Sequence, residues 1–168
     1  MGVMTENVRD IRMEIKGLLL DPSSNVPVVM LKEEGGSRHL PIWIGVFEAN
    51  AIALRLDGCE PQRPMTHDLL RSAFEELGAD VERIVISDLR DSTFYALIYA
   101  TQQDRSVVID ARPSDAIALA LRAQVPIYVR STVLDKAQAA DQAAEVNDEQ
   151  LKKWLEELNP DDLGKYTM

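Results

Sequence analysis

A stretch of eleven residues occurs twice in the chain, and this repeat constrains the fold more than any other feature. Residues 44–54, with the sequence IGVFEANAIAL, align without a gap with residues 109–119, IDARPSDAIAL, at a constant offset of 65. Each copy joins an apolar strand to an apolar helix through a short polar segment, which we call an elbow. The chain is therefore expected to contain two related strand–elbow–helix units, and the elbows are the first places to look for a functional site.

The spacing of apolar residues predicts an α+β fold for the 168 residues, which suffice to bury a core without disulfides. We expect mixed or antiparallel sheets around a buried central helix, with a further helix near the C-terminus. The central helix is predicted at 113–123, which is apolar on nearly every side. Strands are predicted at residues 13–20, 26–32, 39–44, 81–87, 93–101, 106–110 and 126–129. Two more helices are predicted after Gly45 and after Thr66, the latter with Leu69, Leu70, Ala73, Phe74 and Leu77 turned inward.

The composition of the last quarter divides the chain into three parts. Residues 8–135 are predicted to form the domain, 136–147 an alanine-rich tether, and 148–168 a docking helix with a short tail. A narrow apolar stripe in the last part consists of Leu151, Trp154, Leu155 and Leu158. Because so short a helix is marginal alone, the stripe is expected to cover a surface of the same chain or of a neighbour, and we expect a homodimer.

Charge and cysteine content narrow the classes of function. The net charge of −10 argues against sequence-independent binding of nucleic acid through a broad basic face. The lone Cys59 excludes an internal disulfide, and the sequence has neither a secretory pattern nor an apolar run approaching about 20 residues. We therefore expect a cytoplasmic protein that does not enter a membrane.

Polar side chains gather at three predicted helix starts. Glu48 lies in the first turn of one helix, His67 and Asp68 in that of the next, and Asp115 in that of the third. Carboxylates near a helix N-terminus stabilise it by about 0.3–1 kcal/mol, so capping alone explains each acidic residue. A functional interpretation draws its support from the neighbours of these residues, not from any one of them.

The second elbow contains the densest group of such neighbours. Asp110, Arg112, Ser114 and Asp115 fall within six residues at the carboxyl end of a predicted strand. Two carboxylates with a hydroxyl and an arginine can hold Mg²⁺ or Mn²⁺, which prefer hard oxygen ligands and often take only one or two carboxylates plus substrate phosphate. The same residues can instead tie the strand to the helix through a salt bridge from Arg112. The sequence leaves both interpretations open.

Three segments of the chain resemble the bifunctional nuclease domain family. They are residues 39–45 with residues 48–49 and 51–52, residues 63–69, and residues 110–120 with residues 126–127. The resemblance covers residues 10–135 approximately, and its third segment is highly specific. It implies an α+β fold and a nuclease that acts on both DNA and RNA, but it supplies no settled set of catalytic residues.

A metal-assisted phosphodiesterase is the leading hypothesis for the function. The candidate residues are Glu48, Asp110 and Asp115 as ligands of Mg²⁺ or Mn²⁺, Arg63, Arg112 and Ser114 as phosphate contacts, and His67 with Asp68 as an acid–base pair. The alternative is a non-catalytic domain whose elbows bind a small anion or a protein and whose acidic residues are structural helix caps. The acidic composition favours the alternative, whereas the clustered elbows and the resemblance favour a nuclease with DNA or RNA as its substrate.

Overall fold

A computed structural model describes residues 7–143 of the chain. The elements are β1 (Asp10–Leu20), β2 (Pro27–Glu33), β3 (His39–Trp43), α1 (Val46–Leu56), α2 (Thr66–Glu76), β4 (Ala79–Arg90), β5 (Thr93–Gln102), β6 (Arg105–Ala111), α3 (Pro113–Ala123), β7 (Ile127–Arg130) and α4 (Ser131–Ala143). Their order and their bounds agree with the predicted elements up to β7, with shifts of one to three residues at some ends.

The strands of residues 7–143 form one mixed sheet in the order β3-β2-β1-β7-β4-β5-β6. β1, β2 and β3 pair antiparallel in sequence, as do β4, β5 and β6, and each set of three is followed by a helix, α1 or α3. β7 joins the two sets, because it pairs antiparallel with β1 and parallel with β4. This arrangement confirms the predicted α+β class, while the duplication of a strand–elbow–helix unit stays a prediction from the sequence.

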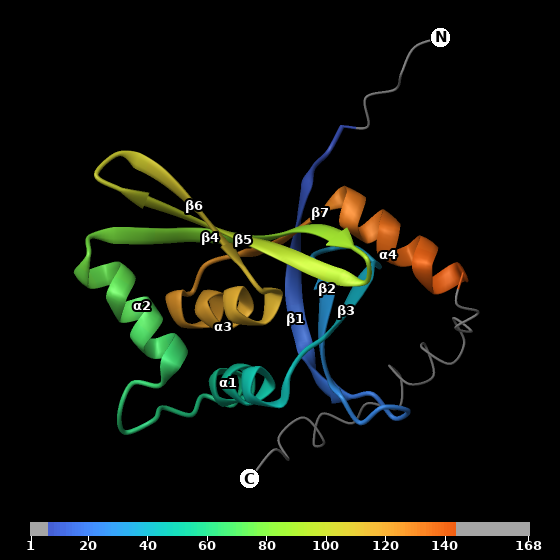
Figure 1. Cartoon of the computed structure of the whole chain (residues 1–168), viewed down its shortest axis with the longest axis horizontal. Helices are drawn as coiled ribbons and strands as arrows, with labels where there is room; N and C mark the ends of the chain where they lie inside the picture. Colours follow the sequence, from blue (N-terminus) through green and yellow to red (C-terminus); the bar gives the residue numbers. More distant parts are fainter. Residues whose placement is uncertain (1–6, 144–168) are drawn as a thin grey trace.

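The central helix α3 is buried as predicted. Residues 116–120 are each at most 1% exposed, and α3 contacts α1, α2, β4 and β5. In Figure 1 the helices α1, α2 and α3 lie together on one side of β4 and β5, whereas α4 lies apart from them, next to β4 and β7. α3 begins with Pro113, where the missing N–H costs nothing because the first N–H groups of a helix have no partner within it. It ends at Ala123 and is followed by Gln124, which has a left-handed φ of 56°. No helix among the described residues is long and apolar enough to cross a membrane.

Helix α2 buries less of its apolar side than the sequence predicts. Leu69 and Leu77 are 63% and 72% exposed, although both were expected to face inward. Leu70 and Phe74 do pack against the core, so the prediction holds for one edge of the stripe only. The reason is the position of α2 at the margin of the helical layer, where α3 and β4 contact it along a narrow line.

Helix α4 continues through residues predicted to be a tether. A tether is predicted at 136–147, yet the helix extends from Ser131 to Ala143. Val133 and Leu134 are fully buried and hold its first turn against the sheet, and Lys136 Nζ donates to Asp88 Oδ1 at 2.9 Å. Packing of the first turn supplies the costly helix nucleus, after which the alanine-rich residues propagate it. The docking helix predicted at 148–168 lies outside the described residues.

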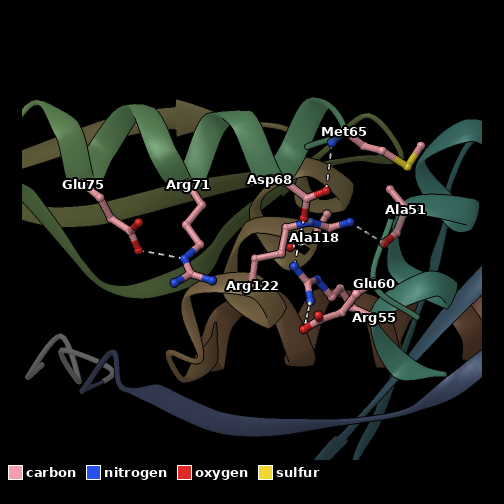
Figure 2. A network of polar contacts seen from close by, with 9 residues as sticks. All are labelled: Ala51, Arg55, Glu60, Met65, Asp68, Arg71, Glu75, Ala118 and Arg122. Carbon is pink, nitrogen blue, oxygen red and sulfur yellow. Dashed lines mark hydrogen bonds and ion pairs between the residues drawn. The ribbon is translucent and has the colours of Figure 1, made fainter. Parts of the chain in front are cut away.

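A buried ion pair joins the three helices that surround the elbows (Figure 2). Arg122 on α3 has a side chain that is 2% exposed, and its Nε donates to Asp68 Oδ1 on α2 at 2.8 Å. Its two other nitrogens donate to backbone carbonyls, Nη1 to Ala118 on α3 at 2.9 Å and Nη2 to Ala51 on α1 at 3.0 Å. One guanidinium therefore binds α1, α2 and α3 at once.

Asp68 is the acceptor at the centre of this network. Its Oδ1 also accepts from Arg55 Nη2 at 3.0 Å, and its Oδ2 accepts from the backbone N–H of Met65 at 2.9 Å, which closes the start of α2. Burial raises the pKa of Asp68, but the Met65 N–H and the two guanidinium groups outweigh burial, and the pKa of this carboxyl lies below its usual value. Asp68 is thus ionised at neutral pH and compensates the buried charge of Arg122.

Removing the Asp68 carboxylate should destabilise the protein strongly. We expect Asp68→Ala to lower the free energy of unfolding by about 3–5 kcal/mol, because it leaves the guanidinium of Arg122 buried without a counter-charge. Glu75→Ala is the matched control on the same helix, since Glu75 pairs with Arg71 at 2.7 Å on an exposed face. That variant should cost about 0.5 kcal/mol or less. Urea unfolding of both variants measures the difference, and equal costs would remove the ion pair from its structural role.

Candidate active site where three helix starts meet

Four side chains from three helix starts form a connected cluster, which we call the Asp115 cluster. Asp115 Oδ1 lies 2.9 Å from His67 Nε2, and Asp115 Oδ2 accepts from Arg112 Nε at 2.8 Å. Arg112 Nη2 in turn lies 2.9 Å from Glu48 Oε1. The cluster therefore runs from Glu48 through Arg112 and Asp115 to His67, and it combines residues from both elbows with one from the start of α2.

The backbone of each helix start explains why these side chains meet. Arg112 is the extended residue before α3, with φ −68° and ψ 144°, so its side chain projects beside the first turn that carries Asp115. Glu48 and His67 occupy the first turns of α1 and α2. α3 packs against both of these helices, which brings their starts to the second elbow. The positive ends of helices favour the two carboxylates at this place.

Gly45 lets the Glu48 side chain fold back toward the start of its own helix. A Cβ atom on residue 45 would overlap the Glu48 carboxylate. The side chain of Glu48 is 18% exposed, and its Oε1 is held by Arg112. Glycine at this elbow position thus belongs to the geometry of the cluster, because any other residue would displace a carboxylate that is already in an ion pair.

The electrostatics of the cluster are set mainly by Asp115 and Arg112. Burial raises the pKa of Asp115, but hydrogen bonds from Arg112 and His67 together outweigh burial, and the pKa of the carboxyl lies below its usual value. Hydrogen bonding to Asp115 and Glu48 raises the pKa of Arg112. Both groups are therefore charged at neutral pH. The side chain of Arg112 is 65% exposed, whereas that of His67 is 10% exposed, so Arg112 is the member that an incoming molecule meets first.

The structure separates two residues that are predicted from the sequence to form a pair. His67 and Asp68 are adjacent in the chain and were expected to act together as acid and base. The imidazole of His67 instead contacts Asp115, while Asp68 binds Arg55 and Arg122 in the network of Figure 2. Asp68 therefore fixes the start of α2, and the carboxylate that accompanies His67 is Asp115.

The other predicted site residues do not join the cluster through contacts of their own. Asp110 is exposed on the edge strand β6, and Arg63 is exposed on the loop between α1 and α2. Ser114 is 6% exposed in the first turn of α3. Of these two predicted phosphate contacts, Arg63 is thus exposed just before α2, and Ser114 is buried at the start of α3.

The predicted metal ligands are only partly assembled. Within residues 7–143, no group of three or more His, Cys, Asp and Glu side chains is arranged to hold a metal ion. Glu48 and Asp115 have the hard oxygens that Mg²⁺ and Mn²⁺ prefer, but both carboxylates bind the guanidinium of Arg112. A metal ion between these two carboxylates would either displace Arg112 or use the oxygen lone pairs that the guanidinium leaves free. The structure therefore preforms a carboxylate–arginine–carboxylate bridge at this place.

Sequence reasoning missed the two arginines that support the site. Arg122 and Arg55 carry no motif, and neither was a candidate. A signal was nevertheless present, because Arg122 follows six consecutive apolar residues, Ala116–Leu121, in the most buried helix. A single cation in such a helix predicts a buried counter-ion.

Comparisons with known proteins show which family the chain resembles in sequence. The model of the family described as the bifunctional nuclease domain matches residues 29–142. The protein MT1877 of Mycobacterium tuberculosis (strain CDC 1551 / Oshkosh), which is named as uncharacterized, is 43% identical over 159 residues, covering 88% of this chain and 94% of its own length. Bifunctional nuclease 1 of Oryza sativa subsp. indica is 28% identical over 118 residues, covering 68% of this chain and 36% of its own length.

A second rice protein is also similar to this chain over part of its length. Bifunctional nuclease 2 of Oryza sativa subsp. japonica is 25% identical over 132 residues, covering 76% of this chain and 41% of its own length. The chain thus spans less than half the length of either rice protein. The family model matches more than half of the chain, including both elbows and the helix α3. The chain therefore belongs to the bifunctional nuclease domain family.

Proposed function

We propose that this protein hydrolyses phosphodiester bonds of DNA or RNA at the Asp115 cluster. The observation that carries the proposal is the contact of His67 Nε2 with Asp115 at 2.9 Å, next to an exposed arginine that binds the same carboxylate. A histidine oriented by a carboxylate can transfer protons, and an arginine beside it can bind a phosphate. The names of the rice relatives support a nuclease.

In this proposal His67 transfers the proton and Asp115 orients it. With Nε2 held by Asp115, the other ring nitrogen, Nδ1, is the atom that exchanges a proton with water or with the leaving oxygen. The ionised carboxylate stabilises the imidazolium that forms when His67 accepts a proton. This division of roles replaces the acid–base pair of His67 and Asp68 expected from the sequence.

Arg112 is the proposed contact for the scissile phosphate. Its Nε and one N–H of Nη2 serve Asp115 and Glu48, which leaves three N–H groups of the guanidinium for phosphate oxygens. Arg63, exposed on the loop before α2, is the proposed second contact along the nucleic acid. Ser114 is the third candidate for phosphate binding from the second elbow.

A divalent metal requirement is part of the proposal. The Asp115 cluster holds two carboxylates and one arginine, so it is net negative with neutral His67, and a polyanion approaches it more readily when a cation is present. Mg²⁺ or Mn²⁺ supplies charge neutralisation and activates water in such sites. Glu48 and Asp115 are the proposed ligands, whereas Asp110 lies on the face of β6 away from α3 and does not join them. The lone, exposed Cys59 suits a reducing compartment, and we propose a cytoplasmic setting.

The alternative function is a non-catalytic anion- or protein-binding domain. The observation in its favour is that Glu48, Arg112 and Asp115 already satisfy one another and that both acidic residues lie in first helical turns. In that case the cluster is a set of structural caps that joins three helix starts. The variant of Asp115 described next distinguishes the two functions.

Asp115→Asn should abolish cleavage of single-stranded RNA or DNA while leaving the protein folded. Asparagine keeps the size and much of the capping capacity of Asp115 but loses the charge that orients His67. The cost in unfolding free energy should be about 1–2 kcal/mol, the scale of a cap and a charge-assisted hydrogen bond. Asp88→Asn, which removes a carboxylate bound to Lys136 outside the Asp115 cluster, is the control and should keep full activity. If Asp115→Asn cleaves as fast as the wild type, the residue is a cap.

Chelation tests the metal requirement separately. The purified protein should cleave single-stranded nucleic acid with Mg²⁺ or Mn²⁺ and should lose this activity in EDTA, because hard-oxygen ligands bind the ion reversibly. Re-addition of the metal in excess over EDTA is the control and should restore the rate. Activity that persists in EDTA would rule out the metal while leaving proton transfer by His67 in place.

Replacing either proposed phosphate contact by lysine should weaken binding of nucleic acid even though the charge is kept. Arg112→Lys and Arg63→Lys lose the planar fork that binds two phosphate oxygens at once. Arg71→Lys, on the exposed face of α2, is the matched control and should bind like the wild type. Fluorescence anisotropy with a labelled single strand measures the affinity. Wild-type affinity in both folded test variants would remove these arginines from the site.

A further inference from the structure

The two edges of the sheet differ in how they are protected against pairing with another strand. The edge strand β3 contains Pro41, which has no N–H to offer and is typical of protected edges. The opposite edge strand, β6, has no proline over its seven residues, and its only charged residues are Arg105 and Asp110. Figure 1 shows the β5–β6 hairpin at the margin of the sheet. Within residues 7–143, no strand pairs with the outer side of β6, which is therefore an open edge with unused backbone N–H and C=O groups.

Apolar side chains of β6 are exposed on both faces of this edge. Val108 is 51% exposed and lies opposite Tyr99 of β5, on the face away from α3. Ile109 is 38% exposed and lies opposite Ile98, whose own side chain is buried on the helical face. A strand added beside β6 would cover the side chains of Val108 and Ile109, and its backbone would pair with the free N–H and C=O groups of β6.

We propose that β6 pairs antiparallel with β6 of a second copy of this chain, with the two-fold axis at Val108. In an antiparallel pair, directly opposite residues lie on the same face of the sheet. A two-fold axis perpendicular to the sheet therefore passes beside one residue of the strand, which lies opposite the same residue of the second copy. An axis at Val107 would set Asp104 opposite Asp110 of the second copy, which is a like-charge pair. An axis at Val108 sets Ser106 opposite that Asp110, where the hydroxyl can donate to the carboxylate.

A second copy fits this edge better than a foreign strand for two reasons. β6 itself carries one Arg and one Asp, so two copies meet without net charge although the whole chain carries −10. The axis at Val108 also sets Val107 opposite Ile109 of the second copy, which continues the apolar layer under the sheet. The pairing uses the open edge of both copies, and the edges that stay free are the two β3 strands with Pro41, so assembly stops at a dimer.

Disulfide trapping at the proposed axis tests the pairing and its register. Directly opposite residues of antiparallel strands have Cα atoms about 4.5–5.5 Å apart, within the span of a disulfide. In the full chain with Cys59→Ser, Val108→Cys should form a covalent dimer under mild oxidation, seen on a non-reducing gel. Ser106→Cys, on the same strand and face, is the matched control and should stay mostly uncross-linked. Cross-linking by Val107→Cys in place of Val108→Cys would overturn the proposed register.

The oligomeric state of the uncross-linked chain gives the second test. Size-exclusion chromatography with light scattering should show a dimer for the full chain and a monomer for Val108→Lys, because a charge on an edge strand opposes pairing. Leu69→Lys, which adds the same charge at an exposed leucine of α2, should remain a dimer. A monomeric wild type, or a dimer that Val108→Lys leaves intact, would overturn the proposal. A complex with another protein from the cell at β6, without a dimer, would overturn it as well.

Discussion

The ion pair between Arg122 and Asp68 is the interaction on which the rest of the helical layer depends. A guanidinium that is almost completely buried must be compensated by nearby acceptors, and Asp68, Ala118 and Ala51 supply one for each of its three nitrogens. They belong to three different helices, so compensation is complete only when α1, α2 and α3 are packed in one arrangement. The ion pair therefore couples the formation of the core to the placement of three helix starts.

This coupling determines where His67 lies. Asp68 is the next residue along α2, and its contacts with Arg122 and Arg55 fix the first turn of the helix against α3. His67 then faces Asp115, which lies 48 residues away in the sequence, at 2.9 Å. A structural carboxylate and a candidate catalytic histidine thus occupy adjacent positions with separate roles. The acidic residues of the Asp115 cluster can stabilise their helices and take part in chemistry at once, because their charge near the helix N-terminus acts without a capping hydrogen bond.

The sequence was sufficient for much of the fold because most of its elements have strong local patterns. The strands alternate or are fully apolar, and α3 is apolar on nearly every side, so its burial followed from composition alone. The two failures have a common cause in tertiary packing. Leu69 and Leu77 of α2 fit an inward stripe, but no element covers that side within the described residues. In α4, Val133 and Leu134 order a helix where the alanine-rich sequence has no clear stripe.

The candidate site was predictable as a set of residues but not as a set of contacts. Glu48, Arg112, Asp115 and His67 were each identified by their position at a helix start. Which carboxylate accompanies His67 depends on the packing of α2 against α3, and local sequence carries no information about that distance. The adjacency of His67 and Asp68 in the chain suggested a pair that the first turn of α2 does not allow. The contact with Arg122, which was not predicted from the sequence, explains why Asp68 faces the core.

The proposed function requires His67 and Asp115 to act as one unit in phosphodiester hydrolysis. A double-mutant cycle on kcat/KM tests it most directly, with His67→Ala, Asp115→Asn and the variant that carries both. Residues that act as a unit are strongly non-additive, so the account predicts that the double variant is no slower than the slower single variant. Losses that multiply in the double variant, or a single variant that retains wild-type kcat/KM, would contradict the account.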